Sequence, residues 1–181
     1  DDPTKTMVTN DPSNVTYNGL DQKWEPVVKD GNTVLVKDTD YTVTYSADTK
    51  NVGQVTVTIT GINNYSDSVK KTYNITPAQV TVKADNKSKV YGATDPALTA
   101  TVTGLVNNES QSLIIYTIAR QSGEAAGTYT ITPSGAATQG NYSVKFETGT
   151  FTITSKPIVD PDDQTKTMVT NDPSNVTYNG L

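Results

Sequence analysis

The side chains that perform most covalent chemistry in proteins are missing from this chain, because its 181 residues include no histidine and no cysteine. Their absence excludes a Ser-His-Asp or Cys-His nucleophile and most zinc sites. Paired carboxylates, as in glycoside hydrolysis, remain available. The acidic residues, however, lie mainly in sequences typical of polar turns, as at Asp38, Asp40, Asp95 and Glu109. We therefore expect no enzymatic activity and no cofactor.

One segment carries enough carboxylates to hold a metal ion, the sequence DPDDQ at residues 160–164. Asp160, Asp162 and Asp163 offer the oxygen ligands that calcium prefers, although their spacing is not that of an EF-hand loop. The same composition is typical of a solvated acidic linker. We favour the linker, with no bound metal, and keep a calcium site as the alternative.

The only tryptophan, Trp24, is the candidate for ligand binding. The face of an indole ring suits stacking against the apolar side of a sugar, and the same ring is a good anchor for a small core. Buried anchoring is the favoured interpretation, and a sugar-binding platform is the alternative.

Charge and hydropathy exclude two further classes of partner. The chain has 14 basic and 19 acidic residues, a net charge of −5 and no run of five or more basic residues, so we expect neither nucleic acid nor an anionic membrane surface as a partner. The longest apolar run, Leu113–Tyr116, is far shorter than the roughly 20 residues of a membrane span, so we expect no membrane insertion.

Alternation of apolar residues with threonine predicts β-strands along most of the chain. Three stretches show it: Tyr41–Tyr45, Val55–Thr60 and Leu98–Thr103. This period of two places the apolar residues on one face of a sheet. Asp30-Gly31 predicts the turn of a β-hairpin. In Asn107–Ile114 the sequence allows one or two helical turns with Asn108 as N-cap.

The chain ends by repeating its beginning. Asp1–Leu20 and Asp162–Leu181 agree at 19 of 20 positions, with only Pro3 and Gln164 differing, at an offset of 162 − 1 = 161 residues. A fainter repeat lies within this unit, where residues 52–76 resemble residues 126–154. We therefore predict two related modules at residues 4–77 and 78–156, an acidic linker containing proline at 157–164, and the start of the next repeat copy at 165–181.

Two motif sets resemble known repeat families. TYNGLDQKWEPVVKDGNTVLVKDTDYTVTYSADTKNVGQVTVTITGINNYSDSVKKTYNIT resembles bacterial Ig-like repeats, and VYGATDPALTATVTGLVNNES with GTYTITPSGAATQGNYSVKFETGTFTIT resembles the MBG repeat (YGX type) of long adhesins and mucus-binding-type proteins. The segment before Glu25-Pro26 is longer than usual for the first family and contains Trp24. Neither family supplies catalytic or obligatory ligand residues.

The resemblance implies two small β-sandwich modules of Ig-like type, with a β-grasp as the alternative for the second. It also implies a secreted tandem repeat on a Gram-positive bacterial surface, anchored to the cell wall in the full-length protein. Its partners are then the neighbouring identical repeats of the same chain. We expect a stalk that carries a terminal binding domain. The alternative is a repeat that itself binds host mucin or glycoprotein glycans, weakly and with avidity from the array.

An amide cross-link between lysine and asparagine occurs in bacterial surface β-domains that lack disulfides. Asn74 lies in the last predicted strand of the first module, with Lys5 or Lys23 as candidate amine and Glu25 or Asp40 as the assisting carboxylate. Simple exposure of these polar side chains to solvent is the favoured interpretation.

Overall fold

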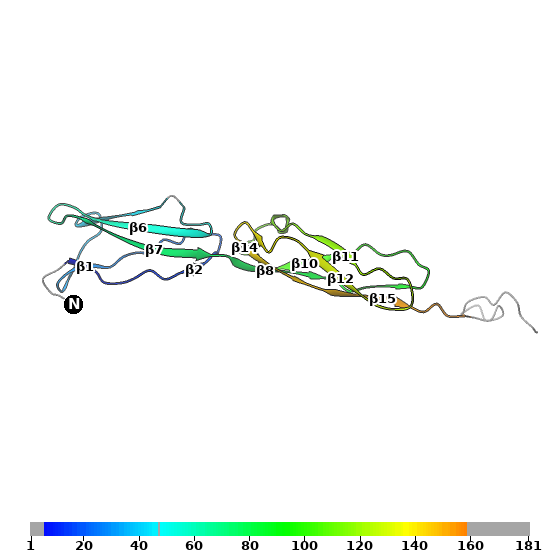
Figure 1. The fold of residues 1–181 in the computed structure, drawn as a ribbon. Helices are drawn as coiled ribbons and strands as arrows, with labels where there is room; N and C mark the ends of the chain where they lie inside the picture. Colours follow the sequence, from blue (N-terminus) through cyan, green and yellow to red (C-terminus); the bar gives the residue numbers. More distant parts are fainter. Residues whose placement is uncertain (1–5, 47, 159–181) are drawn as a thin grey trace, which may run out of the picture. The chain divides into compact units, whose positions relative to one another are not determined.

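The computed structural model describes residues 6–46 and 48–158, in which nearly all regular structure is β-strand (Figure 1). The one helical element in this part of the chain is a 3₁₀ turn, η1 (Gln111–Leu113). The all-β prediction is confirmed. The β-grasp alternative needs a helix that crosses the sheet, and the described residues provide none.

The chain forms two compact units, each described here by itself. Of the described residues, unit 1 combines 6–46, 48–82, Val102–Tyr116 and Gly135–Lys145, and unit 2 combines Lys83–Thr101, Thr117–Ser134 and 146–158. The modules predicted at residues 4–77 and 78–156 stay a prediction, and the predicted repeat start at 165–181 lies outside the described residues.

Unit 1 contains two sheets built from the first seven strands. The smaller sheet has the order β1-β3-β4, with β1 (Thr6–Val8), β3 (Val28–Asp30) and β4 (Thr33–Val34). The larger sheet has the order β2-β7-β6-β5, with β2 (Val15–Thr16), β7 (Ser68–Thr76), β6 (Gly53–Gly61) and β5 (Tyr41–Tyr45). The strands β1 and β2 therefore each lie at the edge of a sheet.

The core of unit 1 follows the predicted alternation. In β6, Val55, Val57 and Ile59 are 1%, 0% and 4% exposed, while the threonines between them are half-buried on the opposite face. Val28 of the smaller sheet is also buried. Apolar side chains of both sheets thus meet in one thin core, as in a sandwich.

Two local predictions need correction. The hairpin between β3 and β4 exists, but Asp30 pairs with Thr33, so its turn is Gly31-Asn32, one residue later than predicted. Gly31 has φ +55°, which suits the first central position of a tight hairpin turn. Asn108 does not cap a helix: it has φ +55°, whereas an N-cap residue is extended, and Ser110 caps η1 instead.

Unit 2 contains a sheet of order β11-β12-β15-β9, formed by β11 (Thr117–Arg120), β12 (Gly127–Ser134), β15 (Gly149–Thr154) and β9 (Lys87–Val90). The remaining sheet has the order β10-β8-β14-β13, with β10 (Ala100–Thr103), β8 (Ala78–Ala84), β14 (Tyr142–Glu147) and β13 (Thr138–Gln139). Its residues are divided between the units: β13 and the larger parts of β8 and β14 belong to unit 1, and Ala84 belongs to unit 2. Ala84 of β8 packs in one cluster with Ile131, Phe151 and Ile153 of the first sheet. Unit 2 is therefore sandwich-like as well.

Both units start their main sheet in the same way. The short strand β2 pairs in parallel with the end of β7, and β9 pairs in parallel with the end of β15. The backbone N–H of Tyr17 donates to the carbonyl of Thr76 at 2.8 Å, and that of Tyr91 donates to Thr154 at 2.8 Å. This shared construction gives the faint internal repeat a structural meaning.

Truncation of the central isoleucine of unit 2 tests this description of its core. Ile131 is 0% exposed, so Ile131→Ala is expected to lower the free energy of unfolding of unit 2 by about 2–5 kcal/mol. Ile158 is 83% exposed, and Ile158→Ala is the matched control, expected to change it by less than about 0.5 kcal/mol. Denaturant unfolding followed by circular dichroism measures both, and equal effects would contradict the core assignment.

Candidate functional site

Of the predicted metal-binding and ligand-binding residues, the structure describes only Trp24. Asp160, Asp162 and Asp163 lie outside the described residues, so the calcium alternative stays a prediction. Within residues 6–46 and 48–158, no group of three or more acidic side chains is arranged to hold a metal ion.

Trp24 lies in the segment that precedes β3 and is half-buried. Its carbonyl accepts a hydrogen bond from the Tyr45 hydroxyl at 2.8 Å, and the next residue, Glu25, pairs with Lys37 at 3.1 Å. Burial of part of the residue fits an anchor, and the exposed part leaves surface for a ligand. The Trp24 alternatives therefore both stay open.

The cross-link candidates are also placed. The side-chain amide of Asn74 donates to the Oδ1 atom of Asn14 at 3.4 Å, and Glu25 pairs with Lys37 rather than with the proposed Lys23. Lys5 lies outside the described residues. These contacts hold Asn74 at the β2 edge of the sheet, and the cross-link stays a prediction.

A cavity of about 400 Å³ in unit 1 is lined by residues of both sheets, including Thr6–Val8 of β1. Its apolar lining includes Val28, Leu35 and Ile59, and its polar rim includes Asp40 and Asp67. The Oδ2 atom of Asp40 already accepts a hydrogen bond from the backbone of Val36 at 2.8 Å, which gives this carboxylate a structural role in its turn.

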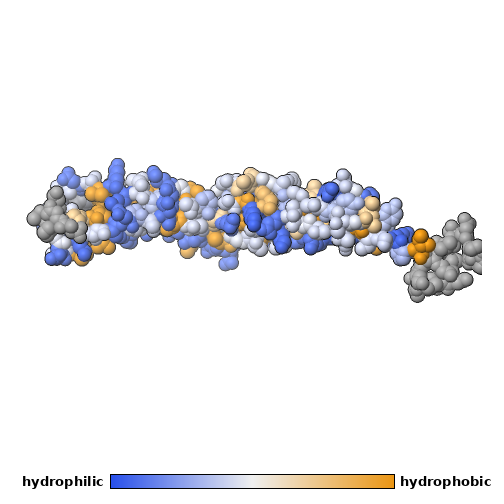
Figure 2. Space-filling view, turned by 60° about the horizontal axis from the view of Figure 1, so that its bottom comes forward, coloured by the Kyte–Doolittle hydropathy of each residue, from blue (hydrophilic) through white to orange (hydrophobic). Residues whose placement is uncertain are grey.

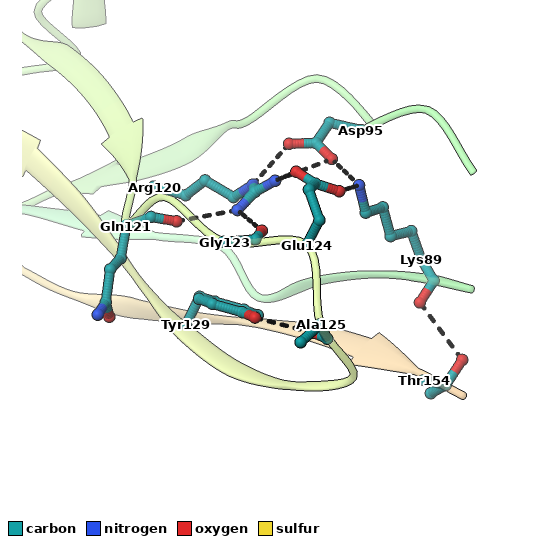
Figure 3. Close-up of polar contacts among 9 residues, drawn as sticks. All are labelled: Lys89, Asp95, Arg120, Gln121, Gly123, Glu124, Ala125, Tyr129 and Thr154. Carbon is teal, nitrogen blue, oxygen red and sulfur yellow. Dashed lines mark hydrogen bonds and ion pairs between the residues drawn. The ribbon is translucent and has the colours of Figure 1, made fainter. Parts of the chain in front are cut away.

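Four charged side chains meet in unit 2, and Figure 3 shows how they interlock. The guanidinium of Arg120 donates through Nε to Asp95 at 2.5 Å and through Nη2 to Glu124 at 2.5 Å. The ammonium of Lys89 donates to Asp95 at 2.6 Å and also contacts Glu124. These four contacts join two cations and two carboxylates in a closed ring with no net charge, here called the ion cluster. The side chains of Lys89 and Arg120 are only 5% and 11% exposed.

The strand register explains why the cations of the ion cluster are shielded from solvent. Arg120 of β11 pairs with Ile131, and Lys89 of β9 pairs with Ile153, so both cations share a sheet face with the core isoleucines. The guanidinium lies 4.8 Å from the centre of the Phe151 ring and 5.6 Å from that of Tyr129. Such stacking suits the weakly hydrated arginine better than lysine.

The loop before Tyr129 is fixed by the same arginine (Figure 3). Nη1 of Arg120 donates to the carbonyls of Gln121 at 2.9 Å and Gly123 at 2.8 Å, and the Tyr129 hydroxyl donates to the carbonyl of Ala125 at 2.8 Å. The ion cluster therefore ties both edge strands of the sheet, β9 and β11, to their adjoining loops.

The pKa shifts in the ion cluster all favour its charged forms. Hydrogen bonds from Arg120, and next from Lys89, lower the pKa of Asp95 to about 2. Hydrogen bonds from Lys89 and Arg120 also lower the pKa of Glu124, and the bond to Asp95 raises the pKa of Lys89. All four groups are therefore stabilised in their charged forms, which strengthens the ion pairs between them.

A second polar cluster lies in unit 1. Glu109 accepts hydrogen bonds from the hydroxyls of Tyr17 and Tyr142, each at 2.5 Å, and the two rings meet edge to face with centres 5.6 Å apart. The Tyr142 hydroxyl accepts in turn from the backbone N–H of Val106 at 3.2 Å. We call Tyr17, Glu109 and Tyr142 the tyrosine bridge.

Amide groups extend the tyrosine bridge within unit 1. The side chain of Asn141 donates to Asn51 at 2.7 Å and accepts from the backbone N–H of Val52 at 3.0 Å. Asn107 donates to the carbonyl of Gly19 at 3.4 Å. Three segments that are distant in the sequence are thus held together by neutral groups and one carboxylate, which form hydrogen bonds with one another.

Hydrogen bonding and burial tune the groups of the tyrosine bridge. The bond to Glu109, followed by burial, raises the pKa of Tyr17, whereas burial comes first for Tyr142 and raises its pKa to about 12. The two hydroxyls lower the pKa of Glu109. The carboxylate is therefore ionised, and both tyrosines are neutral, across the physiological pH range.

Sequence reasoning assigned Asp95 and Glu109 to ordinary turns and missed both clusters. One signal was available for the ion cluster, since Arg120 is the only arginine among the 14 basic residues. For the tyrosine bridge no local signal exists, because Tyr17 and Glu109 are separated by 92 positions.

Comparison with known families supports part of the sequence prediction. Residues 80–152 match the sequence model of the MBG domain (YGX type). The matched segment is less than half of the 181-residue chain, lies within the predicted second module and includes Tyr91-Gly92. The resemblance of this module to MBG repeats, which occur in surface proteins, is therefore confirmed. No curated protein matches the chain.

The described part of the chain contains no helix with the length and apolar character needed to cross a membrane.

Replacing the arginine of the ion cluster should raise the pKa of Asp95. Arg120→Met keeps an apolar stem on Phe151 but removes the main donor, so the pKa should move from about 2 toward the ordinary value of about 3.9. Because the folded pKa lies below the unfolded one, the stabilisation from Asp95 is complete above about pH 3.9 and is lost as pH falls toward 2. NMR titration of the carboxyl carbon measures this.

The matched variant Arg120→Lys keeps the charge but loses the planar fork, and it should give an intermediate pKa. A value that stays near 2 in Arg120→Met would show that Lys89 alone sets it.

Removing the charge from the tyrosine bridge should affect its two tyrosines unequally. In Glu109→Gln the pKa of Tyr17 should fall more than that of Tyr142, because the bond to Glu109 is the main cause of the shift only for Tyr17. Tyrosine ring titration by NMR measures both values. Tyr45, whose pKa of about 12 has other causes, is the internal control. A larger fall at Tyr142 would contradict the assignment.

Proposed function

We propose that this chain is a repeat unit of a bacterial cell-surface adhesin, in which it forms part of a stalk that projects a terminal binding domain from the cell wall. The observation that carries the proposal is the return of Asp1–Leu20 as Asp162–Leu181 at 19 of 20 positions. Near-identical repetition is typical of tandem arrays, in which each added copy extends the protein.

The character of the two units supports a structural role. Each has its own buried core, and the polar side chains of both clusters have protein partners, so neither needs a ligand to complete its structure. The match of residues 80–152 to a family of surface-protein repeats points to the same setting. In this role the partners of the repeat are its own neighbours in the array.

Direct binding of mucin or glycoprotein glycans is the second candidate function, and the half-exposed position of Trp24 favours it. On the face drawn in Figure 2, hydrophobic residues form small separate groups among hydrophilic ones. A surface of that kind suits weak contacts that gain strength from multivalency rather than one tight site. We propose neither nucleic acid nor membrane as a partner.

Binding to a mucin and glycan array separates the two functions. A stalk predicts no dose-dependent binding by either the one-repeat or the two-repeat protein. A direct binder predicts binding that strengthens by about 10²-fold or more with the second repeat through effective concentration, and that is lost in Trp24→Ala. Trp24→Phe keeps an aromatic ring and is the matched control. Strong binding by both proteins would contradict the stalk.

A further inference from the structure

The segment Thr6–Leu20 of unit 1 supplies only sheet edges. Its strand β1 pairs with β3 through Thr6↔Asp30, Met7↔Lys29 and Val8↔Val28, and its strand β2 pairs with β7 through Val15↔Ile75 and Thr16↔Thr76. Each strand has a partner on one side alone. The segment can therefore leave unit 1 without breaking any pairing between the other strands.

Side chains of this segment lock it to the surface beneath. Asn10 accepts from the backbone of Val27 at 2.7 Å and donates to the carbonyl of Glu25 at 3.1 Å. Asp11 pairs with Lys71 at 2.5 Å, and Asn14 accepts from the backbone of Asn74 at 2.8 Å. We call this surface, formed by residues 22–30 and β7 together with the partners of Tyr17, the first-strand seat.

Tyr17 is the anchor in the first-strand seat. It is 3% exposed, its backbone N–H donates to Thr76, and its hydroxyl donates to Glu109. Beside it, Gly19 has φ +79° and accepts a hydrogen bond from Asn107, so the turn after the anchor also belongs to the seat.

The same chain contains a second sequence that fits this seat. Every residue of Thr4–Leu20 recurs in Thr165–Leu181. The counterparts of Asn10, Asp11, Asn14 and Tyr17 are, in the same order, Asn171, Asp172, Asn175 and Tyr178. All the contacts described above can be made by either segment. We propose that Thr165–Leu181 of one molecule replaces Thr4–Leu20 in the first-strand seat of a second copy, which links the copies by strand exchange.

Equal contacts make the exchange nearly neutral in free energy, so concentration and the rate of opening decide its extent. The resident segment has the advantage of direct connection to the seat, and the incoming one gains as the concentration of copies rises. Exchange of an identical element between protomers is a low-cost route to association. This inference does not depend on whether the repeat is a stalk or a binder.

Disulfide trapping tests the exchange, and the absence of native cysteine makes the result easy to interpret. Thr16 and Thr76 are register partners whose hydroxyls lie 3.5 Å apart. Thr177 is the counterpart of Thr16 in the second segment. In the variant Thr76→Cys/Thr177→Cys, the two cysteines therefore come within disulfide-bonding distance only when the second segment occupies the seat. The protein is incubated at high concentration under mildly denaturing conditions in which unit 1 opens partly. It is then returned to native conditions and oxidised.

Cross-linked dimers and larger species on a non-reducing gel are the expected result. Thr16→Cys/Thr76→Cys should instead give an internal bond in a monomer, which confirms the geometry, and Thr44→Cys/Thr177→Cys controls for random collision. A Thr76→Cys/Thr177→Cys protein that stays reduced, or that forms only an internal bond in a monomer, overturns exchange between copies.

Two anchor variants give a reciprocal readout by analytical ultracentrifugation. Tyr178→Ala leaves the resident anchor intact and should weaken association by roughly a hundredfold. Tyr17→Ala weakens the resident segment and should increase association, with folding checked by circular dichroism. If Tyr17→Ala does not fold, Asn14→Ala is the milder substitute at the same seat. Association that is unchanged in Tyr178→Ala overturns the proposal.

Discussion

Parallel pairing of a short strand with the end of the last long strand is the constraint on which both units depend. In unit 1 it joins β2 to β7, and in unit 2 it joins β9 to β15. Parallel neighbours cannot be joined by a tight turn, so the chain must cross to the other sheet and return before the pair can form. The hairpins β5-β6-β7 and β11-β12, and the burial of apolar faces between two sheets, follow from that path. Folding therefore relies on contacts distant in sequence, which form slowly.

The sequence was most informative where the signal was local and periodic. Alternation at Val55, Val57 and Ile59 predicted a strand with one buried face, because each side chain senses only its own strand. The hairpin at Gly31 was predicted with an error of one residue, since either Asp30 or Gly31 can begin a tight turn. The prediction that Asn108 caps a helix was wrong. Asparagine also adopts the left-handed conformation, and Asn108 does so here in a turn that is not the start of a helix. Polar partners such as Glu109 and Tyr17 depend on three-dimensional proximity, which no local pattern encodes.

The two units complete their thin cores with different polar chemistry. Hydrophobic residues make up only 34% of the chain, so polar side chains also contribute to the packing of each unit. In unit 2 the ion cluster surrounds Arg120 with carboxylates and aromatic rings, whereas in unit 1 two neutral hydroxyls share a single carboxylate. No buried side-chain nitrogen or oxygen in the described residues lacks a hydrogen-bond partner. Satisfied polar networks of this kind specify one arrangement because any other leaves a buried group unpaired.

The position of Arg120 also determines how readily an arginine-specific protease can cleave this chain. A protease specific for arginine has one peptide bond to cleave here, between Arg120 and Gln121, and its recognition residue is 11% exposed. The side chain it must bind is held by Asp95, Glu124 and two backbone carbonyls, and β11 is paired to β12. Cleavage therefore requires local opening of unit 2, and its rate reports the population of the open form. If such units are repeated in an array, opening of the ion cluster in any single copy is enough for such a protease to cut the chain.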